Sequence, residues 1–60
     1  MKKLVALRKK KGLSQRALGK LSGVSHITIA RIETGQFDPR LSTLRCLAKT
    51  LKVKISALVD

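Results

Sequence analysis

Apolar residues recur at helical spacing near both ends of the chain. Near the start, Leu4 and Leu7 lie three residues apart among lysines and arginines, which predicts an amphipathic helix over residues 2–11 that is ended by Gly12. Farther along, residues at offsets of 3, 6, 7 and 10 predict another helix. They are Leu41, Leu44, Leu47, Ala48 and Leu51. Both patterns favour helices that turn one face toward a shared core.

Between these two, a second helix is predicted over residues 14–22. Ser14 is a good N-cap, and Leu18 and Leu21 are expected to point inward. The helix breaks at Gly23, where we expect a turn with the positive φ that glycine adopts readily. A chain of 60 residues gains little from an idle interruption. The break is therefore expected to set an angle between two helices.

A third helix restarts directly behind this break. Ser25 is placed to cap a helix that runs through about Glu33. Its Ile29 and Ile32 are expected to face inward, and Gly35 ends it. The following QFDP is predicted to be a loop, because the residue before a proline is pushed out of the helical region.

The last apolar residues predict a short closing turn or helix that completes the core. They are Val53, Ile55, Leu58 and Val59. Five helices joined by short links make a compact all-α fold, and no linker, repeat or low-complexity segment divides the chain. We therefore expect a single domain over residues 1–60.

The net charge of the chain indicates what kind of molecule it binds. Hydrophobic residues make up 43% of the chain, with one Phe and no Trp or Tyr, so the core must be aliphatic. Fourteen Lys and Arg stand against three Asp and Glu, which gives a formal charge of +11. So much uncompensated charge destabilises a compact state by self-repulsion, and it indicates a polyanion as the partner.

The same counts argue against several other classes of protein. One cysteine cannot form an internal disulfide, and with one histidine it leaves no zinc-ligand set, so neither a metal nor a cofactor is expected. No apolar run approaches the roughly 18 residues of a membrane span. The start, MKKLVALRKKK, has too short an apolar part for a signal peptide. We expect a cytoplasmic protein that is not an enzyme, because so few titratable groups hardly assemble a catalytic pair.

The helix, glycine turn and capped helix over residues 14–33 have the layout of a helix-turn-helix. The two helices of this motif cross closely, so a small residue is needed four positions before the turn glycine, and Gly19 is there. The residues expected to fill the wedge between the helices are Leu18, Val24, Ile29 and Ile32.

Several short motifs carry a resemblance to a known family. GLSQ, SGVS, IETG and a loop that ends in proline before a leucine-spaced helix resemble the lambda-repressor-like Cro/XRE family of DNA-binding domains. The resemblance covers residues 7–53 and continues weakly to Asp60. It implies that helix three enters the major groove of double-stranded DNA while helix two lies across the backbone. It also implies a homodimer, at least on DNA, and an inverted-repeat operator. Departures from the family pattern are Gly19, Ser22 and Lys54, of which the last leaves the length of the final helix open.

Candidate base-reading residues lie on the side of helix three that turns away from the core. At 100° per residue, Ile27 and Arg31 fall opposite the inward isoleucines, with His26 on the flank. Ile27 can contact a thymine methyl group, and Arg31 can donate to guanine O6 and N7. The plainer alternatives are a lone exposed apolar residue, a solvated or phosphate-bound arginine and a surface histidine. For Ile27 and Arg31 the resemblance favours base contact.

Phosphate contacts are expected around the start of helix two and the turn. Gln15 and Arg16 lie near a helix N-terminus, where backbone N–H groups and the positive end of the dipole favour a phosphate. The resemblance favours Gln15 in particular. Further candidates are Lys20, Ser25, Thr28 and Arg40. Ser25 already caps its helix, Thr28 can bond its own helix instead, and any one cation among 14 is often simply solvated.

Three further residues receive structural roles. In the family that the chain resembles, an arginine such as Arg8 joins the first helix to a glutamate such as Glu33 at the end of helix three. We read the two as an ion pair rather than a binding or catalytic pair, because losing one partner would leave a partly buried charge unmatched. Cys46, among leucines, is expected to pack as a small hydrophobic residue.

Two functions from different classes stay open on the sequence. One is a sequence-specific DNA-binding transcriptional regulator of the repressor type, whose bound dimer occludes a promoter. The other is a protein-binding module such as an antitoxin, in which the same fold clamps a partner protein. A cationic membrane-active chain, suggested by the basic start, is disfavoured because the rest of the sequence carries many specific turn and cap signals.

Overall fold

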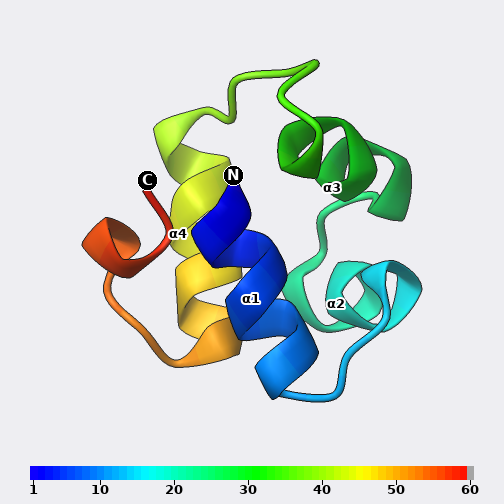
Figure 1. Ribbon diagram of the computed structural model, residues 1–60, viewed down its shortest axis with the longest axis vertical. Coiled ribbons are helices and arrows are strands. Elements are labelled where there is room, and N and C mark those ends of the chain that lie inside the picture. The colour runs from blue at the N-terminus through cyan, green and yellow to red at the C-terminus, as the bar shows by residue number, and fades with distance from the viewer. Residues whose placement is uncertain (60) are drawn as a thin grey trace.

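The computed structural model describes residues 1–59, and these form four α-helices and one turn of 3-10 helix. The α-helices are α1 (Lys2–Lys10), α2 (Gln15–Ser22), α3 (His26–Glu33) and α4 (Leu41–Leu51), and the 3-10 turn is η1 (Ile55–Ala57). Figure 1 shows α1 in front of α4, with α2 and α3 together along one side and a loop that arches from α3 to α4. The all-α prediction is confirmed for the described residues. The expected domain boundary at Asp60 lies outside them.

The prediction of five helices is wrong at the last element. Residues 55–57 make only a single 3-10 turn. Lys54 stands at its N-cap position and makes no side-chain capping bond. Lysine offers only donors, so it cannot accept the free N–H groups that a helix start presents. With three residues in 3-10 conformation, the element does not count as a fifth α-helix.

Local capping sets the bounds of the two central helices. The Ser14 hydroxyl accepts a hydrogen bond from the Ala17 N–H at 3.0 Å and starts α2. The Ser25 hydroxyl accepts from the Ile27 N–H at 3.3 Å and starts α3. Both predicted caps are confirmed. Serine is preferred at this position because its oxygen satisfies an N–H group that has no acceptor within the helix.

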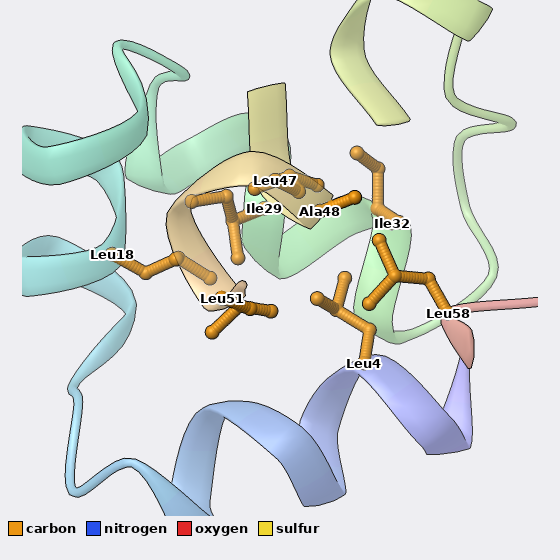
Figure 2. Packing of buried hydrophobic residues seen from close by; sticks show 8 residues of the cluster. All are labelled: Leu4, Leu18, Ile29, Ile32, Leu47, Ala48, Leu51 and Leu58. Carbon is orange, nitrogen blue, oxygen red and sulfur yellow. The ribbon is translucent and has the colours of Figure 1, made fainter. Parts of the chain in front are cut away.

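An aliphatic core joins all four helices to the closing turn. Figure 2 shows its eight buried side chains, which are Leu4, Leu18, Ile29, Ile32, Leu47, Ala48, Leu51 and Leu58. Each fully buried leucine or isoleucine contributes about 1.5–3 kcal/mol relative to exposure to water. Partly buried apolar residues pack around this core, including Val24 in the turn between α2 and α3. The predicted aliphatic core is therefore confirmed.

Four apolar residues expected to pack inward face solvent instead, among them Leu41 at the start of α4, which is 56% exposed. Leu21 is 65% exposed and Val59 is 49% exposed, while the thiol-bearing Cys46 is also exposed. On α2 the inward positions are taken by Leu18 and Gly19, so Leu21 is left beside the helix contact rather than within it. On α4 the inward positions are those of the buried core residues, and Cys46 points elsewhere. At the end of the chain, the buried leucine before Val59 already completes the core.

Candidate nucleic-acid interface

Three helices meet at the carboxyl end of α3, around the carboxylate of Glu33. Arg8 on α1 donates from Nε to Glu33 Oε2 at 2.7 Å and from Nη2 to Oε1 at 3.2 Å. Gln15, the first residue of α2, donates from Nε2 to Glu33 Oε1 at 2.9 Å. Arg8 and Glu33 thus form a bidentate ion pair inside the protein, and such a pair is stronger than one with a single hydrogen bond.

This network is largely closed to water. The side chains of Arg8 and Glu33 are 11% and 6% exposed. Arg8 Nη1 also donates to the backbone oxygen of Leu13 at 2.8 Å, which ties the connection between α1 and α2 to the same cluster. Burial raises the pKa of Glu33, but hydrogen bonds from Arg8 and Gln15 and nearby positive charge outweigh it, so the pKa lies below its usual value. Glu33 is therefore ionised at neutral pH and fixes α3 against α1 and α2.

The turn between α2 and α3 holds the two helices at close range, as Figure 1 shows. Gly23 has a φ of 77°, and its N–H donates to the Gly19 oxygen at 2.9 Å. This left-handed helix end is the conformation predicted for that glycine. A Cβ atom built on Gly19 would stand 2.7 Å from the Val24 oxygen, which is closer than real Cβ contacts allow. The expected need for a small residue at position 19 is confirmed.

The side of α3 that turns away from the core is open to solvent. Ile27 is 54% exposed, whereas Ile29 is fully buried. Arg31 is exposed and His26 is partly exposed. The three residues predicted to read bases therefore lie on or beside the open side of this helix.

A shallow hollow of about 430 Å³ lies where α2 passes the start of α3. Four of the predicted DNA-contacting residues line it, namely Arg16, Lys20, Ser25 and His26. The rest of its wall is formed by Gly19, Gly23 and Val24. Two cationic side chains thus converge with the N-terminal end of a helix, whose dipole is positive there. This arrangement suits an anion such as a phosphate group.

The other predicted phosphate contacts lie outside this hollow. Gln15 turns its amide inward to Glu33. Its backbone N–H belongs to the first turn of α2, where N–H groups have no acceptor within the helix. Thr28 is half-buried on α3. Arg40 is exposed and occupies the N-cap position of α4, beyond the loop that follows α3.

Acidic groups offset little of this positive charge. Among residues 1–59 the carboxylates are those of Glu33 and Asp38. The first is held in the network with Arg8, and the second lies in the loop before α4 and does not line the hollow. Within the same residues, no three metal-ligating side chains gather. None of the helices described combines the length and apolar character that a membrane span requires.

The hydrogen bond from Gln15 to Glu33 was not predicted from the sequence, where Gln15 was assigned a role on DNA. These two residues are 18 positions apart and meet only because three helices converge. The bond from Arg8 to the Leu13 oxygen was missed for the same reason. No spacing within a single helix signals either contact.

The crossed pair of α2 and α3, the tight turn and the cationic open side define a helix-turn-helix protein suited to nucleic acid. The family model described as Helix-turn-helix matches residues 4–58, nearly the whole chain. The chain therefore belongs to this family of lambda-repressor-like DNA-binding domains. No solved structure gives a significant match.

Relatives of the chain include bacterial and phage regulators. It is 46% identical over 57 residues to an uncharacterized HTH-type transcriptional regulator of Haemophilus influenzae, an alignment that covers 88% of this chain and 58% of the relative. It is 40% identical over 55 residues to the HTH-type transcriptional regulator PuuR of Escherichia coli, with 92% and 30% covered. It is 35% identical over 57 residues to the immunity repressor protein of Bacillus phage phi105, with 95% and 40% covered. The chain thus spans between 30% and 58% of the length of these relatives.

Proposed function

We propose that the chain binds a specific sequence of double-stranded DNA as part of a transcriptional regulator of the repressor type. The observation that carries this function is the division of α3 into an anchored inner side and an open outer side, with Ile27 and Arg31 exposed beside the cationic hollow. The major groove admits an α-helix and displays a distinct pattern for each base pair. The names of the relatives, two regulators and one immunity repressor, support transcription as the regulated process.

Three side chains of α3 read the bases. Arg31 donates two hydrogen bonds to O6 and N7 of a guanine, and Ile27 contacts a thymine methyl group. His26, in the first turn of the helix, reaches a base edge or a phosphate. The exposure of Ile27 supports its role, because a thymine methyl offers the apolar contact that the protein core does not.

Phosphate groups are held by α2 and by the start of α3. A phosphate in the hollow meets Arg16 and Lys20, and the Ser25 hydroxyl lies at its edge. The free N–H groups of the first turn of α2 also donate to the DNA backbone, and this places Gln15 beside a phosphate. Thr28 and Arg40 contact phosphates farther along the strand. These contacts set the register of α3 but carry no sequence information themselves.

A homodimer on DNA would use an apolar hollow beside the carboxyl end of α3. The hollow is lined by Met1, Ile32, Gly35, Phe37, Asp38, Pro39, Leu44 and Val59. Phe37 and Val59 are 43% and 49% exposed there, and Leu41 at the start of α4 is 56% exposed. Large apolar side chains gathered in one exposed region favour a protein interface. Because this region adjoins α3, a second copy related by a two-fold axis would present its own α3 on the same side.

The size of the chain suits two neighbouring major-groove sites. Its Cα atoms span 23 × 22 × 19 Å, and side chains widen this envelope on every side. Two copies in contact therefore have centres roughly 30 Å apart, which lets the α3 helices on their DNA-facing side meet half-sites one DNA turn, about 34–36 Å, apart. Such spacing corresponds to an inverted-repeat operator, and a dimer bound there blocks a promoter by occupying it.

Selection from a random duplex-DNA pool tests this function. At about 0.15 M salt the phosphate contribution alone is weak, so enrichment reports base reading. We expect one enriched motif that contains an inverted repeat. The Arg31→Ala variant is expected to lose about 1–3 kcal/mol of discrimination at one base of that motif.

Arg45→Ala is the matched control, because Arg45 is an exposed arginine on α4 rather than on α3. It should leave the enriched motif unchanged. Salt-sensitive binding without any enriched motif would reject sequence-specific recognition. A motif without a repeat would retain base reading and reject the dimer.

A further inference from the structure

A second surface of the chain combines exposed apolar groups with positive charge. It is a hollow of about 620 Å³ between the end of α2 and the second half of α4. Its lining residues are Leu21, Ser22, Cys46, Lys49, Thr50 and Lys52. None of them lines the cationic hollow at the start of α3. We call this surface the α2–α4 groove.

The floor of the α2–α4 groove is apolar and uncovered. Leu21 is 65% exposed, the largest value among the exposed large apolar side chains, and Cys46 is exposed opposite it on α4. The polar groups of the groove are already bonded. The Ser22 hydroxyl accepts from the Val24 N–H at 3.3 Å, and the Thr50 hydroxyl donates to the Cys46 oxygen at 2.9 Å. The groups left to meet a partner are therefore apolar or cationic.

Lys49 and Lys52 supply the cationic edge of the groove. Within residues 1–59 neither has a carboxylate partner, because Glu33 is held by Arg8 and the other acid lies in the loop before α4. Lys52 is the only residue other than glycine with a positive φ in that part of the chain, at 58°. The left-handed conformation costs a residue with a Cβ roughly 1–2 kcal/mol. Glycine at position 52 would avoid this cost, but it would not supply the ammonium group that Lys52 places beside the groove.

The groove faces away from the proposed DNA-reading side. At 100° per residue, Leu21 lies about 200° around the α2 axis from Gly19, and Gly19 packs on the start of α3. Leu21 lines the groove that α2 forms with α4. A partner in the groove can therefore be bound while α3 remains open.

We propose that the α2–α4 groove docks an acidic, leucine-bearing helical segment of a partner protein. Leucine side chains of such a segment cover Leu21 and Cys46, and its carboxylates meet Lys49 and Lys52. Charge complementarity selects an acidic partner, since the described part of the groove carries no carboxylate. Duplex DNA fits less well, because its phosphates can meet Lys49 and Lys52 but leave Leu21, which is 65% exposed, uncovered. Unpaired bases fit less well too, because surfaces that bind them use aromatic side chains for stacking. Phe37, the single aromatic residue of the chain, lines a different hollow.

Cys46 provides a built-in reporter for this site, because it is the one thiol of the chain and is exposed. The experiment follows its alkylation by neutral iodoacetamide, by mass, with and without a synthetic peptide. The peptide is a helix former of about 14 residues, with leucines on one face (offsets 3, 4 and 7) and glutamates beside them. At about 0.15 M salt, long-range attraction between exposed charges is screened within roughly 8 Å.

We expect the peptide to slow alkylation about tenfold when its concentration is ten times its dissociation constant. Versions with glutamine for glutamate, or alanine for leucine, should protect much less. Leu21→Ser should weaken binding about tenfold, which is the order expected for losing one buried leucine side chain. The doubly substituted Lys49→Glu, Lys52→Glu chain should lose protection as well. Each variant is compared with itself without peptide, so changes in thiol reactivity cancel.

Lys9→Glu with Lys10→Glu is the matched control, because it makes the same change in charge at exposed positions on α1. Protection lost equally in this control would show nonspecific attraction and overturn the site. So would protection that survives Leu21→Ser. Protection of Cys46 by duplex DNA instead of the peptide would reassign the groove to nucleic acid. Because the readout is thiol protection, failure here leaves the DNA selection experiment unaffected, and the reverse also holds.

Discussion

The two sides of α3 differ in how firmly the protein holds them. On the inner side, Ile29 and Ile32 are 0% and 1% exposed, and Glu33 is gripped by an arginine and a glutamine from two other helices. On the outer side, Ile27 is 54% exposed and Arg31 is exposed on the helix surface. A helix of eight residues thus separates the groups that fix its position from the groups that remain free to bind. A substitution on the outer side should therefore leave stability unchanged, whereas one on the inner side should lower stability.

The largest effect is expected when Glu33 is replaced by alanine. The change leaves the Arg8 guanidinium, with a side chain 11% exposed, without its carboxylate. Loss of one partner of a buried pair costs about 3–5 kcal/mol. A domain of this length has a total stability of roughly 3–9 kcal/mol. We expect Glu33→Ala to lose about 3–5 kcal/mol of this stability, at least about a third of it, when urea denaturation is followed by circular dichroism.

Asp38→Ala removes the same charge from an exposed loop and serves as the control. Its free energy of unfolding should stay within about 0.5 kcal/mol of the parent value. Equal losses in the two variants would mean that net charge, rather than the ion pair, anchors the inner side of α3.

A matched pair of isoleucines gives the sharpest test of the two sides. Ile29→Ala should lower the free energy of unfolding by about 2–5 kcal/mol, because it empties a buried position. Ile27→Ala should change stability by less than about 0.5 kcal/mol and weaken binding to the selected DNA motif. Urea denaturation and DNA titration on both variants separate the effects. A large loss of stability in Ile27→Ala would end the distinction between the two sides.

Contacts between residues that are close together in the sequence were predictable, and the ends of the helices depend on such contacts. The caps at Ser14 and Ser25 and the positive φ at Gly23 depend on a few adjacent residues. The inner side of α3 was also predictable, since Ile29 and Ile32 lie three residues apart on one helix face. These features need no knowledge of where another helix lies.

Contacts between helices were less accessible to sequence reasoning. Leu21 and Cys46 were expected to be covered, yet whether a neighbouring helix covers a given face depends on the packing of the whole chain. The bond from Gln15 to Glu33 requires three helices to converge at one carboxylate. Likewise, Arg16 and the start of α3 line one hollow only because α2 and α3 pack together in the folded chain.

Gln15 is proposed to act both in the network around Glu33 and in DNA binding, so it does not fit the division between the two sides. Its amide bonds the inner carboxylate, while its backbone lies in the first turn of α2, where we propose a phosphate contact. Gln15→Ala should cost about 1.5–3 kcal/mol of stability, the usual range for a hydrogen bond to a charged group. It should also weaken binding to all DNA sequences alike, because the amide no longer fixes against Glu33 the first turn of α2, whose backbone N–H groups meet the phosphate.

Arg16→Ala supplies the comparison for that variant, because Arg16 is the exposed neighbour on the same helical turn. It should weaken DNA binding to all sequences while its urea midpoint stays near that of the parent chain. If Gln15→Ala lost stability but bound DNA as before under conditions where it is folded, Gln15 would belong to the inner side alone.

Acid pH should have the smallest effect and act on the inner side only. The folded pKa of Glu33 lies below its ordinary value of 4.5, so the unfolded chain takes up this proton first as the pH falls. The stability that the ion pair adds is therefore complete above about pH 4.5 and is lost as the pH falls through the folded pKa. Urea midpoints measured across this range should fall more steeply for the parent chain than for Glu33→Gln. Equal slopes would mean that self-repulsion of a chain with a net charge of +11, rather than this carboxylate, sets its acid limit.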